Sequence, residues 1–180
     1  MANGPNNSIM LKQVIWLVWL GGCLSLTGCS TTTVYIVRHA ERANDSDTTS
    51  ISAAGHQRAQ ALADRLAGTG IDSIFTTPYL RTRQTAAPLA QRLNIQPVTY
   101  PTQPTQTVVD RLKRIRSKEV LVVGHSNTVL EIVRGLGARP SKTKIEHNEY
   151  NNLFVVTLRR RPFAKSADVS ALTYGASPTQ

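Results

Sequence analysis

The sequence has few cysteines, few aromatic residues and few acidic residues. Its two cysteines are Cys23 and Cys29, and Cys23 lies in an apolar amino-terminal run. If that run is removed, no intramolecular disulfide is possible. Aromatic side chains make up 6% of the chain, and neither a stacking platform nor a zinc-ligand spacing is present, which argues against nucleic-acid binding. The excess of basic over acidic residues, 21 against 11, instead suits anionic phosphate ligands or acidic lipid.

The length and apolar content indicate one folded domain. A chain of 180 residues fits one domain with a substantial core, and 41% apolar residues exclude a wholly disordered protein. No internal repeat and no second domain is evident. We expect a signal segment at residues 1–29, a domain at residues 30–160, and a basic, loosely ordered tail at residues 161–180.

The amino-terminal segment is typical of an export signal. Residues 14–20 are apolar and follow Lys12, but the run is shorter than a bilayer-spanning helix usually needs. Residues 26–29, Leu-Thr-Gly-Cys, resemble a bacterial lipobox, in which the chain is cut before Cys29 and this cysteine carries lipid. An uncleaved anchor helix is the alternative, and Met10 is a second possible start. We therefore expect a lipoprotein of the bacterial cell envelope that faces the periplasm or the exterior.

Two short apolar segments each end in a histidine. Residues 34–37 run into Arg38 and His39, and residues 120–123 run into Gly124 and His125. Such segments suit strands buried on both faces, and open α/β sheets bind ligands beyond the carboxyl ends of their strands. The alternative is a solvated basic pair that closes an edge strand.

A third strand leads into an arginine-bearing helix. Residues 71–77 pass through Pro78 into a helix that begins near Arg81, where a guanidinium is well placed to hold an anion. Further elements are predicted from hydrophobic spacing and caps. They are a helix capped by Ser52, a helix to residue 93 that contains Pro88, a short strand at residues 95–100, helices at residues 107–115 and 128–136, and a last strand at residues 153–158.

Three motifs, in this order, resemble the histidine phosphatase superfamily, also called phosphoglycerate mutase-like. They are Arg-His-Ala-Glu at residues 38–41, Tyr-Leu-Arg-Thr-Arg-Gln-Thr at residues 79–85, and Gly-His-Ser at residues 124–126. The resemblance covers about residues 33–159. It implies an α/β fold, a three-layer α/β/α sandwich with a mostly parallel central sheet.

The resemblance also implies the roles of the site residues. His39 would be the nucleophile and form a phosphohistidine without metal or cofactor. Arg38 and Arg81 would clamp the phosphate oxygens, and His125, charged in the working state, would add a third donor. Metal binding is not expected, because no histidine pair has ligand spacing.

The acid that would protonate the leaving group is not evident. Residues 99–109 contain neither Glu nor Gly, and Ser126 stands where another branch places an acid. Glu41 comes first among the local carboxylates, although a salt bridge that orients an arginine is favoured over the acid as its role. The other local carboxylates are Asp45, Asp47 and Glu149. A missing acid would favour substrates with good leaving groups, such as acyl phosphates, phosphoramidates or aryl phosphates.

Three polar residues outside the motifs have weaker interpretations. His56 and His147 are expected at the surface, and Asn127 is expected to position the loop after His125.

The leading function is a membrane-anchored, extracytoplasmic phosphatase whose partner is a phosphorylated small molecule or envelope component. A non-catalytic phosphate- or phospholipid-binding lipoprotein is the alternative, and a phosphomutase is disfavoured.

Overall fold

The computed structural model describes residues 29–177. The predicted signal segment therefore lies outside the described residues, except for Cys29, which is exposed. Within residues 29–177, no helix is long and apolar enough to cross a bilayer.

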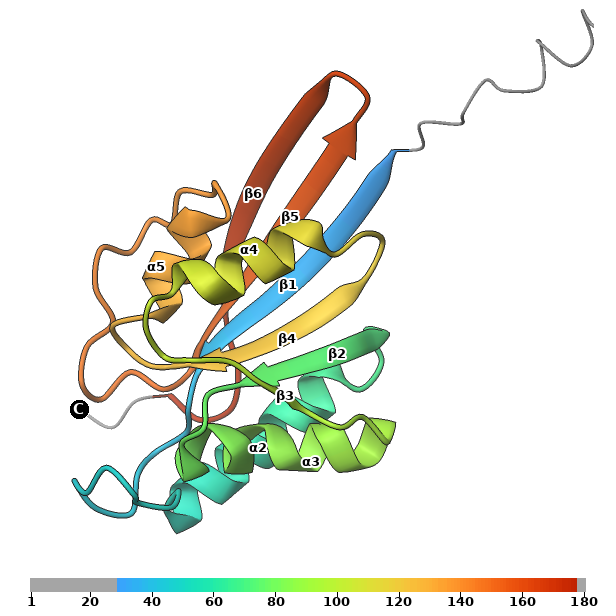
Figure 1. Ribbon diagram of the computed structural model, residues 1–180. Coiled ribbons are helices and arrows are strands. Elements are labelled where there is room, and N and C mark those ends of the chain that lie inside the picture. The colour runs from blue at the N-terminus through green and yellow to red at the C-terminus, as the bar shows by residue number, and fades with distance from the viewer. Residues whose placement is uncertain (1–28, 178–180) are drawn as a thin grey trace, which may run out of the picture.

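A six-stranded sheet forms the centre of the molecule (Figure 1). The strand order is β3-β2-β4-β1-β5-β6. The strands are β1 (Ser30–Arg38), β2 (Ile71–Thr76), β3 (Val98–Thr99), β4 (Glu119–Gly124), β5 (Asn152–Arg161) and β6 (Ala164–Thr173). The first four in sequence are mutually parallel, whereas β5 runs antiparallel to β1 and β6 antiparallel to β5. The predicted α/β class and mostly parallel sheet are thus confirmed.

Two pairs of helices cover the sheet. They are α2 (Ala53–Leu66) with α3 (Leu80–Leu93), and α4 (Gln106–Arg114) with α5 (Val129–Gly135). Residues of α2 and α3 form one core with one face of the sheet, and residues of α4 and α5 form a second core with the other face. The three-layer sandwich is confirmed, and α3 continues through Pro88 without a break.

The central strands β1 and β4 bring their carboxyl ends to the same edge. Ile36 belongs to the core on the α4–α5 side, and Val37 belongs to the core on the α2–α3 side. Both side chains are fully buried, which explains the continuous apolar pattern of a strand covered on two faces. Because Arg38 lies opposite Gly124 in the parallel register, the residues after each strand are neighbours.

The start of α2 is fixed against the loop that follows β1. The Ser52 hydroxyl accepts a hydrogen bond from the amide of Gly55, which is the predicted N-cap. A Cβ atom on Gly55 would lie 2.5 Å from the carbonyl oxygen of Glu41, so only glycine allows this close approach. The loop beside the sheet edge is therefore held by the first turn of a helix.

The prediction of a loosely ordered tail at residues 161–180 is wrong for most of that segment. β5 extends to Arg161, and β6 pairs with it over ten residues. No β6 side chain is buried, and only the partly buried Ala167 and Val169 pack against the core on the α4–α5 side. An edge strand held mainly by its backbone ladder shows little of the apolar alternation from which a strand is predicted.

Candidate active site

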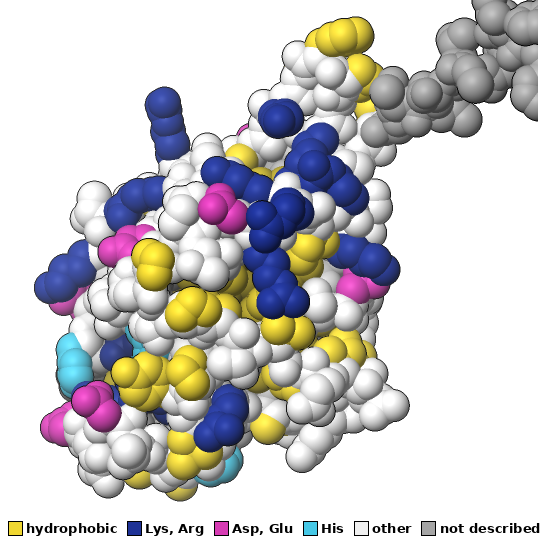
Figure 2. Space-filling model, in the orientation of Figure 1, with side chains coloured by type: hydrophobic (Ala, Val, Ile, Leu, Met, Phe, Trp, Pro, Cys, Tyr) yellow, Lys and Arg dark blue, Asp and Glu magenta, His cyan; other side chains and the backbone are white. Residues whose placement is uncertain are grey.

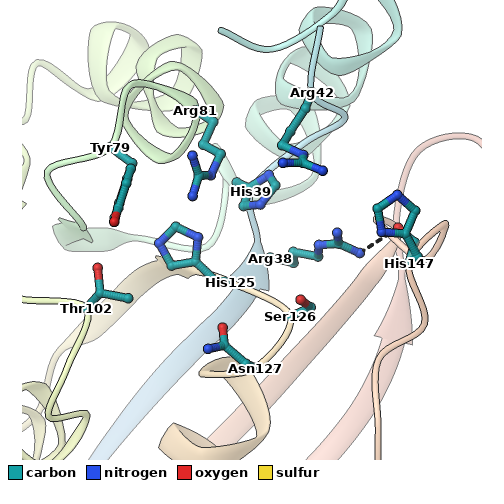
Figure 3. A pocket seen from close by; sticks show the side chains of 10 residues that line it. All are labelled: Arg38, His39, Arg42, Tyr79, Arg81, Thr102, His125, Ser126, Asn127 and His147. Carbon is teal, nitrogen blue, oxygen red and sulfur yellow. Dashed lines mark hydrogen bonds between the residues drawn. The ribbon is translucent and has the colours of Figure 1, made fainter. Parts of the chain in front are cut away.

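A cleft of about 310 Å³ opens beyond the carboxyl ends of β1 and β4 (Figure 3). Its lining residues are Arg38, His39, Arg42, Tyr79, Arg81, Thr102, His125, Ser126, Asn127 and His147. The two histidines and two arginines predicted from the motifs therefore converge on one site, although they come from separate parts of the chain. No carboxylate is among the described residues that line the cleft.

The ring of His39 is held in one tautomer. Its Nδ1 lies 2.8 Å from the carbonyl oxygen of Ala40, and a carbonyl can only accept, so Nδ1 carries the proton. The backbone N–H of Ala40 in turn donates to the hydroxyl of Thr85 on α3, and this bond helps to hold the backbone of Ala40 in place. Nε2 of His39 consequently keeps its lone pair, as a nucleophile requires.

His125 packs against His39 from the end of the neighbouring strand. The two ring centroids are 5.4 Å apart, and Tyr79 meets the other side of the His125 ring at 5.2 Å. Nε2 of His125 lies 3.0 Å from the hydroxyl oxygen of Thr77. This contact uses one ring nitrogen and leaves Nδ1 for the cleft.

Arg38 is anchored by a loop that precedes β5. Its Nη1 donates to the carbonyl oxygens of Glu146, His147 and Glu149 at 3.0, 2.9 and 3.2 Å. The guanidinium also lies 4.0 Å from the ring centroid of Tyr150, within cation–π range. Arg38 is thus fixed at one end of its guanidinium.

Arg81 is held in the same way by the loop after β1. Its Nη1 donates to the carbonyl oxygen of Asp47 at 2.7 Å, and its guanidinium lies 4.3 Å from the ring centroid of Tyr79. Among the described residues, Nε of Arg38 and Nε of Arg81 are buried without an acceptor. Buried donors of this kind normally find a partner, and a bound oxyanion would supply one.

Both histidines are neutral near pH 7 in this arrangement. Burial lowers the pKa of His39 to about 3, and the nearby charges of Arg38 and Arg81 add to the effect. Burial, then Arg81 and Arg38, lower the pKa of His125 to about 4. The resemblance implied a charged His125, whereas this cleft without a bound anion favours the neutral ring. A bound dianion would offset the arginines and raise the pKa of His125.

Glu41 does not line the cleft, and its assignment as the catalytic acid is corrected. Its carboxylate accepts from Nε and Nη2 of Arg58 at 2.8 and 2.6 Å. Arg58 is buried and also donates to the carbonyl oxygens of Tyr174 and Ala176. The salt-bridge role, which was favoured over the acid role, is the one the structure shows.

The other carboxylates considered as acids also have different partners. Asp45 pairs with Arg42, and Glu149 pairs with Lys142. Asp47 reaches the site only through its backbone carbonyl. None of these three carboxylates lines the cleft.

Sequence reasoning did not place His147 or Arg42 in the cleft. His56 and His147 are both exposed, as expected, but His147 also lines the cleft, whereas His56 on α2 does not. Arg42 was not predicted as a site residue, although it directly follows the first motif. The loop that carries His147 contains no motif, so only the fold reveals its position.

A family model matches the amino-terminal part of the folded domain. Residues 34–102 match the model of the histidine phosphatase superfamily (branch 1). This segment contains Arg38, His39 and Arg81. A search of curated proteins found no match.

Solved structures with the same fold include three at low sequence identity. A protein histidine phosphatase SixA complexed with tungstate has 19% identity and a TM-score of 0.60, over 78% of this chain and 96% of that one. Mycobacterial hydrolase 2 has 13% identity and a TM-score of 0.61, over 84% and 93%. A mutant phosphoserine phosphatase from Entamoeba histolytica in complex with phosphoserine has 14% identity and a TM-score of 0.54, over 76% and 94%. These likenesses establish the phosphoglycerate mutase-like fold.

Proposed function

We propose that this protein is a phosphatase that works through a phosphohistidine on Nε2 of His39. One observation carries the proposal: a neutral imidazole with its lone pair on Nε2 borders a cleft in which two anchored arginines have unpaired buried donors. A nucleophile next to preorganised donors for an oxyanion is the arrangement that phosphoryl transfer requires.

The reaction divides into two displacements. In the first, Nε2 of His39 forms a bond to phosphorus, the bond to the leaving group breaks, and the leaving group departs with the electron pair. Arg38 and Arg81 neutralise charge on the phosphoryl oxygens, and His125 adds a donor. In the second, water attacks phosphorus, the phosphorus–nitrogen bond breaks, phosphate leaves, and the lone pair returns to Nε2.

The chemistry of the cleft favours substrates with good leaving groups. None of the described lining residues is a carboxylic acid that could protonate a poor leaving group. Phosphoramidates such as phosphohistidine, acyl phosphates and aryl phosphates need this help least. The similar fold of a protein named histidine phosphatase supports phosphoramidates as the class to test first. The same lack of an acid disfavours a phosphomutase.

The proposed location is the bacterial envelope, with lipid on Cys29. The proposal is supported by the lipobox-like residues 26–29, the preceding apolar run and the exposure of Cys29. Cys29 directly precedes β1, at the strand end opposite the cleft. A lipid anchor there would leave the cleft accessible.

The test is hydrolysis by the full chain of three substrates: phosphohistidine, an aryl phosphate and an alkyl phosphate. We expect release of phosphate from the first two, at least about 100-fold slower release from the third, and an acid-labile phosphoenzyme after rapid mixing. His39→Ala should abolish all release, and His56→Ala, an exposed histidine on α2, is the matched control. Vanadate binding without release from any substrate would favour the non-catalytic phosphate-binding alternative.

A further inference from the structure

The end of the sheet opposite the cleft carries an exposed aromatic residue. Phe163 lies in the turn between β5 and β6, and its side chain is fully exposed, with a relative accessibility of 101%. The turn projects beyond the rest of the sheet (Figure 1). A lone exposed phenylalanine at the tip of a hairpin has no role in the core.

Basic side chains surround the base of this hairpin. A groove of about 370 Å³ is lined by Lys113, Arg116, Leu136, Gly137, Leu158, Arg159, Arg160, Lys165, Ser166 and Ala167. Figure 2 shows Lys and Arg side chains gathered on this part of the surface, below the hydrophobic tip of the hairpin. We call the hairpin turn together with this groove the basic tip.

The basic side chains are mostly uncompensated. Arg159 pairs with Asp168, but Arg160 donates to the backbone carbonyls of Lys113 and Ile115 rather than to a carboxylate. Burial, and then the like charge of Arg116, lower the pKa of Arg160. Positive charge is therefore crowded here, and an anionic surface would relieve the repulsion.

The basic tip adjoins the point where the chain enters the fold. Ser30 lies opposite Arg160 and Thr31 opposite Arg159 in the β1–β5 register. Cys29, which directly precedes Ser30, therefore lies beside the basic tip. β1 spans eight residue steps from Ser30 to Arg38, so the cleft lies roughly 26 Å from this end.

We propose that the basic tip docks on an anionic lipid bilayer. Phe163 enters the boundary between headgroups and acyl chains, and Arg116, Lys165 and their neighbours contact anionic headgroups. The active-site cleft then faces away from the membrane. A bilayer fits better than a nucleic acid, because the single aromatic side chain of the basic tip offers no stacking platform and Cys29, the proposed site of lipid attachment, precedes the start of β1 beside the basic tip.

The experiment uses the full chain, in which Cys23→Ser and Cys29→Ser remove the two native cysteines. Phe163→Cys then provides a single thiol for an environment-sensitive fluorophore. Vesicles of phosphatidylcholine with phosphatidylglycerol are compared with vesicles of phosphatidylcholine alone. With the anionic vesicles, we expect the emission of the label to shift to shorter wavelength and its quenching by acrylamide to decrease. Both effects should be weaker in about 0.5 M salt, because salt screens the attraction between basic side chains and anionic headgroups. The same label on Ser46→Cys, in the loop beside the cleft, should remain in an aqueous environment.

A charge-matched pair of double variants separates docking from general electrostatics. Arg116→Gln with Lys165→Gln should lower protection of the label at residue 163 several-fold. Arg83→Gln with Lys144→Gln, which removes two exposed cations away from the basic tip, should have no such effect. Both double variants should hydrolyse a soluble aryl phosphate like the parent chain, so failure of docking and failure of catalysis are measured separately.

Three outcomes would overturn the docking proposal. The label at residue 163 would stay aqueous with both kinds of vesicle, the two double variants would behave alike, or a DNA duplex and not the anionic vesicles would protect the label.

Discussion

The hydroxyl oxygen of Thr77 lies 3.0 Å from Nε2 of His125 and 2.9 Å from the hydroxyl oxygen of Thr82. Thr77 is fully buried and directly follows β2, and Thr82 lies in the first turn of α3. A short hydroxyl relay thus connects the arginine-bearing helix to the second histidine of the cleft. Because one ring nitrogen is occupied by Thr77, the relay orients the other nitrogen of His125.

Replacing Thr77 should weaken catalysis by releasing this ring. Thr77→Val keeps the shape of the side chain but removes the hydrogen bond, and we expect kcat/KM to fall about 10-fold. Steady-state kinetics and the chemical shifts of the His125 ring would measure the effect.

The neighbouring threonine provides the control. The hydroxyl of Thr76 is also buried, but it has no hydrogen-bond partner. Thr76→Val should therefore leave kcat/KM unchanged and raise the free energy of unfolding by about 1 kcal/mol. Equal kinetics for the two variants would show that the relay does not position His125.

Arg81 should not be replaceable by lysine. Its guanidinium is fixed by the Asp47 carbonyl and the Tyr79 ring, and a lysine ammonium cannot keep both contacts while it binds an oxyanion. We expect Arg81→Lys to lower kcat by about 10² to 10³-fold. Arg83→Lys, an exposed position on the same helix, should have the activity of the parent chain, and a similar loss there would point to a general effect on α3.

Glu41→Gln should affect stability more than catalysis. The substitution leaves the buried guanidinium of Arg58 without its charged partner, and we expect the free energy of unfolding to fall by about 2 to 4 kcal/mol. Turnover of an aryl phosphate in buffer well below the melting temperature should be little changed. A large loss of kcat confined to alkyl phosphates would instead restore Glu41 as the acid.

The two cleft histidines should titrate far below the ordinary range. With pKa values of about 3 for His39 and about 4 for His125, neither ring should take up a proton between pH 8 and pH 5.5. Ring resonances followed by NMR would show this directly. Saturating phosphate or vanadate should shift the titration of His125 upward, because the anion offsets the nearby guanidinium charges.

The same lowered pKa values make the protein less stable in acid. In the unfolded chain both histidines titrate near the ordinary value of about 6.5, so between that pH and their folded pKa values the unfolded state binds more protons. The free energy of unfolding must then fall as the pH falls, by up to about 1.4 kcal/mol per pH unit for each histidine.

Chemical denaturation at several pH values measures how steeply the free energy of unfolding changes with pH. His39→Gln should make the decline shallower between pH 6 and pH 4.5. An unchanged slope in His39→Gln would mean that the folded protein protonates His39 at an ordinary pH.

The strands and helices that build the site were largely predictable. β1 and β4 are continuous apolar segments because they are covered on both faces, and each is followed by a histidine of the cleft. The N-cap at Ser52 and the helix that carries Arg81 were also predicted correctly. β6 was missed, because an exposed edge strand depends on pairing with β5 rather than on its own apolar pattern.

The sequence by itself determined the groups that we propose to react: His39, His125, Arg38 and Arg81, each tied to a local motif at the end of a strand or the start of a helix. Only the tertiary structure decided their surroundings. The packing of distant loops placed His147 in the cleft, turned Glu41 toward Arg58, and buried both imidazoles enough to keep them neutral. Local signals specify which side chain follows a strand, whereas desolvation and ion pairing depend on segments that meet only in the folded chain.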